Sequence, residues 1–131
     1  MISTKIQLRF SDFDMGNHLH NAAYLQYFEI ARIGFFTKSL GDDWDWKKNG
    51  IIIKKNTIEY LKPIFIDAQI SVEVTCSQIG NKSFTLAYQV KDQNGDLKAF
   101  GESLVVCFDY IDNVTTTIPK TILNILELNK A

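Results

Sequence analysis

Two carboxylates and both histidines of the chain stand close together in the polar stretch Ser11–Tyr24. A strand-like run, Lys5–Phe10, leads into this stretch, and a long segment with apolar residues at helical spacing begins near Asn21. The start of a helix offers unpaired backbone N–H groups and the positive end of the helix dipole to a developing negative charge. An aspartate just upstream of those donors could hold or activate a nucleophile. The stretch therefore has the layout of an active site.

The four titratable residues of this stretch suit different roles. Asp14 is the candidate base or nucleophile, although an aspartate here could instead cap the helix start. Asp12 better suits a structural role through hydrogen bonds within the loop. His18 is as well suited to contacting a substrate as to a structural role, whereas His20 fits a structural role. Two histidines and two aspartates also raise the question of a metal, but no third ligand stands at a recognised spacing, so we expect none.

The composition predicts one globular domain over residues 1–131. Hydrophobic residues make up 46% and aromatic residues 12% of the chain, enough for a packed core. The net charge is −1 and no charge run occurs, which argues against nucleic acid or an anionic membrane as the partner. No segment suits a signal peptide or a membrane span, and Cys76 and Cys107 have no CxxC partner. We therefore expect buried thiols and a cytoplasmic protein.

One long helix is predicted over Asn21–Leu40, with Gly41 as its C-terminal stop. Gly34 inside this helix suggests close backbone packing. Trp44 and Trp46 follow in a loop and could cover either the core or an acyl pocket. The apolar residues at helical spacing are Tyr24, Leu25, Phe28, Ala31, Ile33, Phe35 and Phe36.

Four strand-like runs come next, and short turns join the second run to the third and the third run to the fourth. The runs are Ile51–Leu61, Ala68–Cys76, Phe84–Val90 and Leu97–Tyr110. Turns at Gly80-Asn81 and Asn94-Gly95 predict antiparallel hairpins. Gly101 interrupts the last run where the apolar residues change face, which suggests a bulge. A short helix is expected over Pro119–Leu128.

The order of these elements indicates an α+β fold. A strand comes first, then the long helix, and then four antiparallel strands. The long helix is the one element large enough to cover such a sheet, so we expect the sheet to wrap around it.

Three motifs together resemble the hotdog-fold acyl-CoA thioesterases. The segment Phe10–Arg32 is similar to the branch that contains 4-hydroxybenzoyl-CoA thioesterase and the small thioesterases of the Tol–Pal cluster. Ile58–Pro63 looks like the strand-ending motif of that family, and Gly80–Phe84 like its next hairpin. The resemblance covers essentially the whole chain. It implies a hotdog fold, no cofactor, and a homodimer or homotetramer whose active sites are built across the seam between protomers.

The resemblance also implies which residues are catalytic. In the family the second aspartate of a D-x-D pair is catalytic, which is Asp14 here, and the N–H at the position of Asn21 polarises the thioester carbonyl. The chain departs from the Tol–Pal branch, which has a catalytic histidine where Asn21 stands and a glycine where Asn17 stands. A histidine four residues after the aspartate, as at His18, is similar to plant acyl-ACP thioesterases, although those have an asparagine where Gly16 stands. The implied catalytic residues are Asp14, His18 and Asn21.

Substrate contacts are expected from two parts of the chain. Tyr24 stands close enough to the helix start to line the site. CoA carries phosphates that need local cations, and the resemblance points to Lys82 and Ser83 in the hairpin. Lys54 and Lys55 are alternative cations.

The expected function is hydrolysis of an acyl-CoA thioester to the free acid and CoA. A thiol of pKa about 8.5 leaves readily, so the reaction needs a positioned nucleophile and an oxyanion donor. The residues leave open whether Asp14 acts as a base on water or attacks directly, which acyl group is used, and whether CoA or an acyl-carrier protein holds it. Two other functions fit the fold, a hotdog hydratase or dehydratase and a non-catalytic module that binds acyl-CoA or an acyl carrier.

Overall fold

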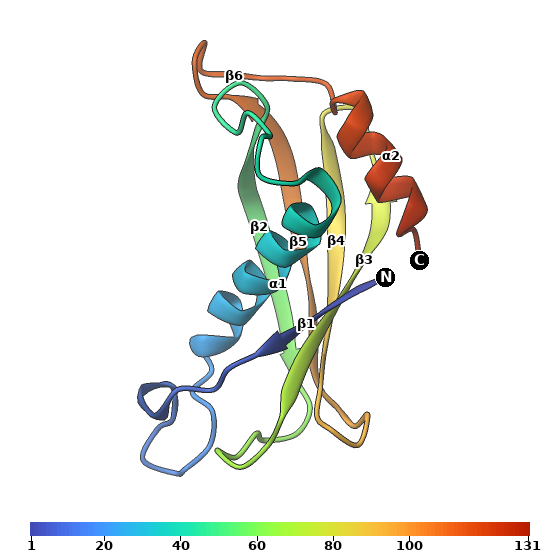
Figure 1. The fold of residues 1–131 in the computed structure, drawn as a ribbon. Helices are drawn as coiled ribbons and strands as arrows, with labels where there is room; N and C mark the ends of the chain where they lie inside the picture. Colours follow the sequence, from blue (N-terminus) through green and yellow to red (C-terminus); the bar gives the residue numbers. More distant parts are fainter.

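A computed structural model describes residues 1–131, with six strands and two α-helices (Figure 1). The elements are β1 (Ile2–Ile6), a 3₁₀ turn η1 (Phe10–Asp12), α1 (Ala23–Leu40), β2 (Gly50–Tyr60), β3 (Ile70–Ile79), β4 (Ser83–Lys91), β5 (Leu97–Asp109), β6 (Val114–Thr115) and α2 (Lys120–Leu128). The class is α+β, and every expected helix and strand is present. The first strand begins and ends earlier than expected, because the chain leaves the sheet after Ile6 and enters η1.

The strands form one antiparallel sheet in the order β1-β3-β4-β5-β2, with β6 paired to β5. The hairpins expected at Gly80-Asn81 and Asn94-Gly95 join β3 to β4 and β4 to β5. Gly95 has φ +79°, which a glycine adopts without strain. The sheet ends on one side at β1, a strand of five residues, and on the other at β2, a strand of eleven residues. The edge of β2 therefore exposes a long row of backbone groups.

α1 crosses one face of the sheet (Figure 1). The aromatic rings of Phe28 on α1 and Tyr88 on β4 stack with their centroids 4.3 Å apart. Leu25 and Ile33, which share the helical spacing, are exposed instead, because they lie on the other side of α1. The buried residues of α1 are Ala23, Tyr24, Tyr27, Phe28, Ala31, Phe35 and Phe36.

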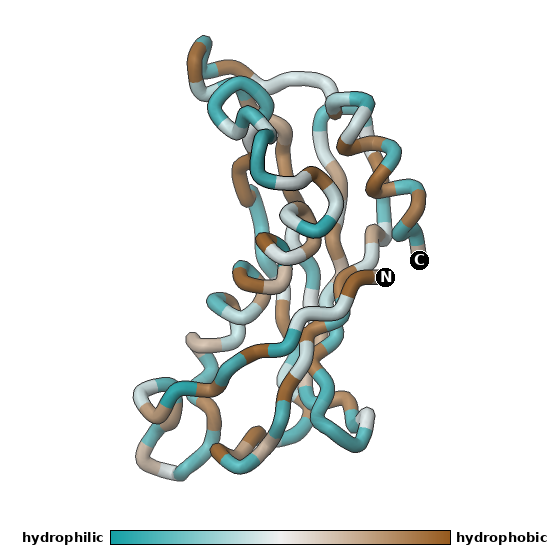
Figure 2. The backbone as a smooth tube through the Cα atoms, in the orientation of Figure 1, coloured by the Kyte–Doolittle hydropathy of each residue, from teal (hydrophilic) through white to brown (hydrophobic).

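The shorter helix covers a separate part of the sheet. Hydrophobic and hydrophilic stretches alternate along α2 in Figure 2, and its apolar stripe of Ile122, Ile125 and Leu126 is buried. The main chain next to α2 joins the edge of β3, since Cys76 N donates to Asn129 O at 2.9 Å. None of the helices has the length and apolar character needed to cross a membrane.

The bulge expected at Gly101 is absent, so that prediction was wrong. Gly101 keeps its register with both neighbouring strands, and the buried positions of β5 stay at odd numbers from Ala99 to Asp109. A Cβ at Gly101 would overlap the carbonyl oxygen of Thr57 and lie 2.8 Å from the ring of Phe28. Glycine is needed because the Phe28 ring packs directly onto the backbone of β5. The register shifts of this sheet occur elsewhere, for example between Ile53 and Lys55.

Two further expectations about packing are confirmed. Gly34 allows α1 to approach β1, since a Cβ there would lie 2.6 Å from Thr4 Oγ1. Cys76 and Cys107 are buried free thiols, and burial raises the pKa of Cys107 to about 11.

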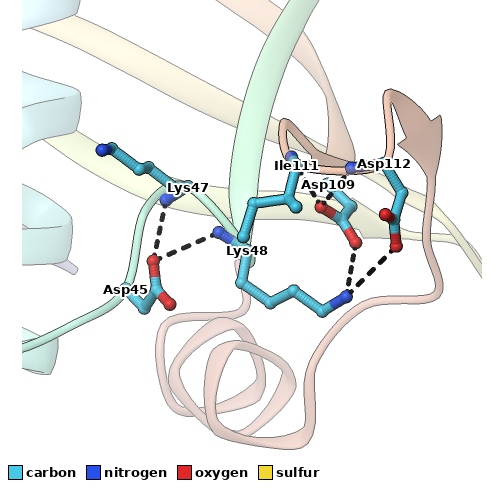
Figure 3. A network of polar contacts seen from close by, with 6 residues as sticks. All are labelled: Asp45, Lys47, Lys48, Asp109, Ile111 and Asp112. Carbon is cyan, nitrogen blue, oxygen red and sulfur yellow. Dashed lines mark hydrogen bonds and ion pairs between the residues drawn. The ribbon is translucent and has the colours of Figure 1, made fainter.

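An ionic network ties the loop before β2 to the end of β5 (Figure 3). Lys48 Nζ lies 2.7 Å from Asp109 Oδ2 and 3.5 Å from Asp112 Oδ2. The hydrogen bond from Lys48 and the backbone N–H groups of the turn hold the pKa of Asp109 below its ordinary value. Asp45 Oδ1 accepts from the backbone N–H groups of Lys47 and Lys48, which fixes the turn that carries Lys48. The network thereby anchors the loop that contains both tryptophans.

Candidate active site

A cleft of about 240 Å³ opens at the N-terminal end of α1. It brings together four of the residues that the sequence predicts for the site, while a larger hollow of about 720 Å³ on β2, β4 and β5 contains none of them. We therefore place the candidate site by its chemical groups and not by its volume. The residues that line the cleft are Asp14, His18, Leu19, Asn21, Tyr24, Tyr60, Leu61, Lys62 and Pro63.

Asp14 lies in a tight turn that fixes its carboxylate. The turn is closed by hydrogen bonds from Asp14 N to His18 O and from Asn17 N to Asp14 O, both 3.0 Å. Asn17 has φ +63°, a conformation that asparagine tolerates better than most residues. Asp14 Oδ1 accepts from Gly16 N at 2.9 Å, and Asp14 Oδ2 has no hydrogen bond within the protein. The carboxylate is thus held by one oxygen, its other oxygen is free, and the residue lines the cleft.

Gly16 brings the carboxylate and the imidazole onto the same side of the turn. A Cβ at Gly16 would lie 3.3 Å from Asp14 Oδ1 and 3.4 Å from His18 Cε1, so both side chains pass over its Cα. The His18 ring also meets the Phe65 ring edge to face, at a centroid distance of 5.5 Å. His18 is therefore positioned beside Asp14, with an aromatic ring behind it.

The start of α1 has no side-chain cap, and Asp14 does not supply one. The N-cap residue is Ala22, and no side chain hydrogen-bonds to the first backbone N–H groups of the helix. The alternative in which Asp14 caps the helix is therefore wrong. The N–H groups of Asn21 and Ala22 have no hydrogen-bond partner. Because they stand at the positive end of the helix dipole, they can stabilise an oxyanion.

Two tyrosines form the wall of the cleft beside the helix start. The rings of Tyr24 and Tyr60 meet edge to face at 5.0 Å, and Tyr60 Oη donates to Asn21 O at 3.2 Å. Burial, together with the neighbouring Tyr60, raises the pKa of Tyr24 to about 12, so its hydroxyl stays protonated. Tyr24 Oη has no hydrogen-bond partner within the protein. It is therefore free to donate to a molecule in the cleft.

Asp12 has a structural environment and is turned away from the cleft. Its carboxylate is buried and accepts from Arg9 Nη2 at 2.9 Å and from Tyr27 Oη at 2.6 Å. Burial alone would raise the pKa of Asp12, but the hydrogen bonds from Arg9 and Tyr27 and the Arg9 charge hold this pKa below its ordinary value. Burial and the bond to Asp12 raise the pKa of Tyr27. Asp12 therefore ties η1 to α1, which agrees with the role expected from the sequence.

Lys82 and Ser83 lie at the opposite end of the sheet from the cleft, in and beside the turn between β3 and β4 (Figure 1). This chain alone does not bring them to Asp14. The cation that lines the cleft is Lys62, which also lies 3.5 Å from Asp96. Sequence reasoning missed Tyr60 and Lys62 as site residues, although both belong to the strand-ending motif Ile58–Pro63. No three side chains of the types His, Cys, Asp and Glu are grouped to hold a metal ion.

Comparison with known proteins connects this chain to one family. A family model described as the thioesterase-like superfamily matches residues 8–126. The uncharacterised protein YsmA from Bacillus subtilis (strain 168) is 29% identical over 92 residues, which are 70% of this chain and 62% of that protein. The chain thus spans less than two thirds of this relative.

Solved structures of several thioesterases have a similar fold. A thioesterase from Thermus thermophilus, solved with coenzyme A and zinc, is 26% identical with a TM-score of 0.82, and the match covers 95% of both chains. A predicted thioesterase from Bacillus stearothermophilus is 24% identical with a TM-score of 0.87, over 98% of this chain and 96% of that one. A 1,4-dihydroxy-2-naphthoyl-CoA thioesterase from Synechocystis is 14% identical with a TM-score of 0.84, over 95% and 93%. At these last two identities the similarity shows the fold alone.

Proposed function

Since this chain belongs to the thioesterase-like superfamily, we propose that it is an acyl-CoA thioesterase, which hydrolyses an acyl-CoA thioester to the free acid and CoA. One observation carries the proposal. A fixed carboxylate with a free oxygen, on Asp14, shares a cleft with Asn21, whose N–H is unpaired just before the start of α1. The similar Thermus thermophilus thioesterase, which was solved with coenzyme A, supports CoA as the carrier.

The proposed mechanism uses this chain's own groups for both chemical tasks. Asp14 Oδ2 removes a proton from a water molecule that attacks the thioester carbonyl, or attacks the carbonyl itself to give a mixed anhydride that water then hydrolyses. In both routes a carbon–oxygen bond forms, the carbon–sulfur bond breaks, and the sulfur leaves as a thiolate. The N–H groups of Asn21 and Ala22 stabilise the tetrahedral oxyanion. His18 orients the attacking water, and the Tyr24 hydroxyl contacts the substrate.

Thiol release from a panel of thioesters tests this function. The panel contains short, long and aromatic acyl-CoA substrates together with their pantetheine thioesters, and a thiol-trapping dye follows turnover. We expect hydrolysis of at least one acyl-CoA well above the rate in buffer. Binding of acyl-CoA without thiol release would indicate a binding module instead. Water added across the double bond of an enoyl-CoA, with the thioester intact, would indicate a hydratase.

The architecture proposed for this function is a single hotdog domain over residues 1–131, with the sheet wrapped around α1. The packing of α1 on one sheet face and the similar folds of solved thioesterases support this proposal. The wrapped helix would then present its N-terminus, and the cleft beside it, at one end of the sheet.

A homo-oligomer follows from the free edge of β2. An exposed edge of eleven residues invites pairing with another strand, and a second copy can supply it across a twofold axis. Antiparallel pairing of two β2 strands would place the β3–β4 turn of one protomer beside the cleft end of its partner. Light scattering at micromolar concentration should give the mass of a dimer or tetramer. A monomer mass would contradict the shared site.

The β3–β4 turn would in this assembly meet the CoA phosphates through Lys82, with Ser83 beside it. Lys82→Glu is expected to raise KM for acyl-CoA by at least about fivefold and to change kcat little, because a remote phosphate contact contributes mainly uniform binding. The same variant should hydrolyse a pantetheine thioester, which lacks the nucleotide, at the normal rate. Lys55→Glu on β2 is the comparison, since Lys55 is the alternative cation. An effect confined to Lys55→Glu, or an equal loss on both substrates, would contradict the assignment of Lys82.

A further inference from the structure

Tyr60 makes the one side-chain hydrogen bond to the peptide group between Asn21 and Ala22, directly before α1. Its hydroxyl donates to Asn21 O at 3.2 Å. The main-chain bond to the same oxygen, from Tyr24 N, is 3.3 Å long. The edge-to-face contact with Tyr24 holds the Tyr60 ring in place. The last residue of β2 therefore acts directly on the backbone of the candidate oxyanion site, which starts 39 residues earlier in the chain.

The direction of this bond determines where the free N–H of Ala22 points. In a trans peptide the C=O and N–H of one plane point in opposite directions. A donor that fixes Asn21 O therefore also fixes the aim of Ala22 N–H. The preceding peptide, which carries Asn21 N–H, is fixed in the same way by the bond from Ala23 N to His20 O at 2.9 Å. Both free N–H groups are thus aimed by hydrogen bonds on the far side of their peptide planes.

We propose that Tyr60 is a positioning residue for Ala22 N–H, one of the two oxyanion donors proposed for this thioesterase. The inference rests on the proposed function and adds a residue to it. Tyr60 touches the peptide that carries the donor and transfers no proton. Stabilisation of an oxyanion depends on donors that are already aimed before charge develops. Because no side chain caps α1, the Tyr60 hydroxyl is the one side-chain group that hydrogen-bonds to the Asn21–Ala22 peptide at this end of the helix.

Tyr60→Phe is the test, because it keeps the ring and removes the hydroxyl alone. We expect kcat to fall about tenfold, which is less than the roughly 100-fold that loss of a whole oxyanion donor costs. KM should stay within about twofold, since the donor acts mainly in the transition state. The pH profile of kcat should keep its shape, because Tyr60 transfers no proton in the mechanism. A role in stability alone would not produce this split between kcat and KM.

Tyr110→Phe is the matched control. The Tyr110 hydroxyl donates to a main-chain carbonyl, Ile51 O, at 2.8 Å, and the tyrosine is 48% exposed against 43% for Tyr60. This variant loses the same kind of bond on β2 and should keep the kcat of the natural protein. Normal kcat in Tyr60→Phe, or an equal loss in both variants, would overturn the inference while leaving the proposed function intact. Absence of thiol release from the natural protein would overturn both.

Discussion

Asp14→Asn is expected to lower kcat roughly 100-fold or more without disturbing the fold. The amide oxygen still accepts the hydrogen bond from Gly16 N, so the turn keeps its conformation. What the variant lacks is the basic, negatively charged oxygen that faces the cleft, and a lost general base costs about this much. Because Asp14 does not cap α1, the melting temperature should change little.

The measurement is kcat, KM and melting temperature on the one variant, beside Asp45→Asn. Asp45 also accepts a backbone N–H two residues on, Lys47 N at 3.1 Å, but it lies in the loop before β2 and outside the cleft. This control should keep normal turnover. If Asp14→Asn also turned over normally, the proposed mechanism would lose its central residue.

Asp12→Ala should do the opposite, lowering the free energy of unfolding by about 2 kcal/mol while the folded protein keeps most of its turnover. The Tyr27 hydroxyl would be left buried without an acceptor, which costs about 1–3 kcal/mol. The Arg9 side chain is 59% exposed, so loss of its ion pair adds little. Chemical denaturation at pH 7 measures the difference.

The acid dependence of this difference has a definite sign. The pKa of Asp12 is lower in the folded protein than its ordinary value of 3.8, so its contribution is present above that value and lost as the pH falls through the folded pKa. The gap between the natural protein and Asp12→Ala should therefore narrow below about pH 4. Tyr27→Phe added to Asp12→Ala should recover part of the lost stability, because no hydroxyl is then left unpaired. A gap that stayed constant down to the acid transition would contradict this account.

The sequence predicted the elements of this fold well where local signals were strong. Asn94-Gly95 indicated a hairpin, and the turn that forms needs the left-handed conformation at Gly95 alone, with φ +79°. Gly101 misled the prediction because a glycine in a strand has two explanations. A β-bulge and close packing of a side chain on the strand backbone both favour glycine. Only the position of the Phe28 ring on α1 shows that close packing is the reason here. Ile33 likewise fits the helical spacing but is exposed. The spacing of apolar residues does not tell how wide the buried face of a helix is, so this exposure could not be predicted.

The site was predictable only as far as it is local in sequence. Asp14, His18, Asn21 and Tyr24 come from one short stretch, and the cleft contains all four. Tyr60 reaches the same cleft from the far end of β2, and that proximity depends on how β2 and the start of α1 pack in the folded chain. The proposed role of Lys82 could not be judged from one chain. Lys82 lies at the opposite end of the sheet from Asp14, so its role depends on a second copy of the chain.

The uncapped start of α1 has a consequence for selection. Ala22 has helical dihedral angles (φ −65°, ψ −24°), so a serine or aspartate there caps α1 only if this residue becomes extended, and a cap that forms is worth about 0.5–2 kcal/mol. A cap oxygen at residue 22 would accept from Tyr24 N or Leu25 N, next to the N–H groups of Asn21 and Ala22, and an aspartate there would repel the oxyanion that those groups stabilise. A selection of variants for thermal stability alone would therefore favour substitutions of Ala22 that reduce turnover. Substitutions that stabilise the enzyme without loss of turnover are therefore expected elsewhere, for instance along α2, with the N-terminus of α1 left uncapped.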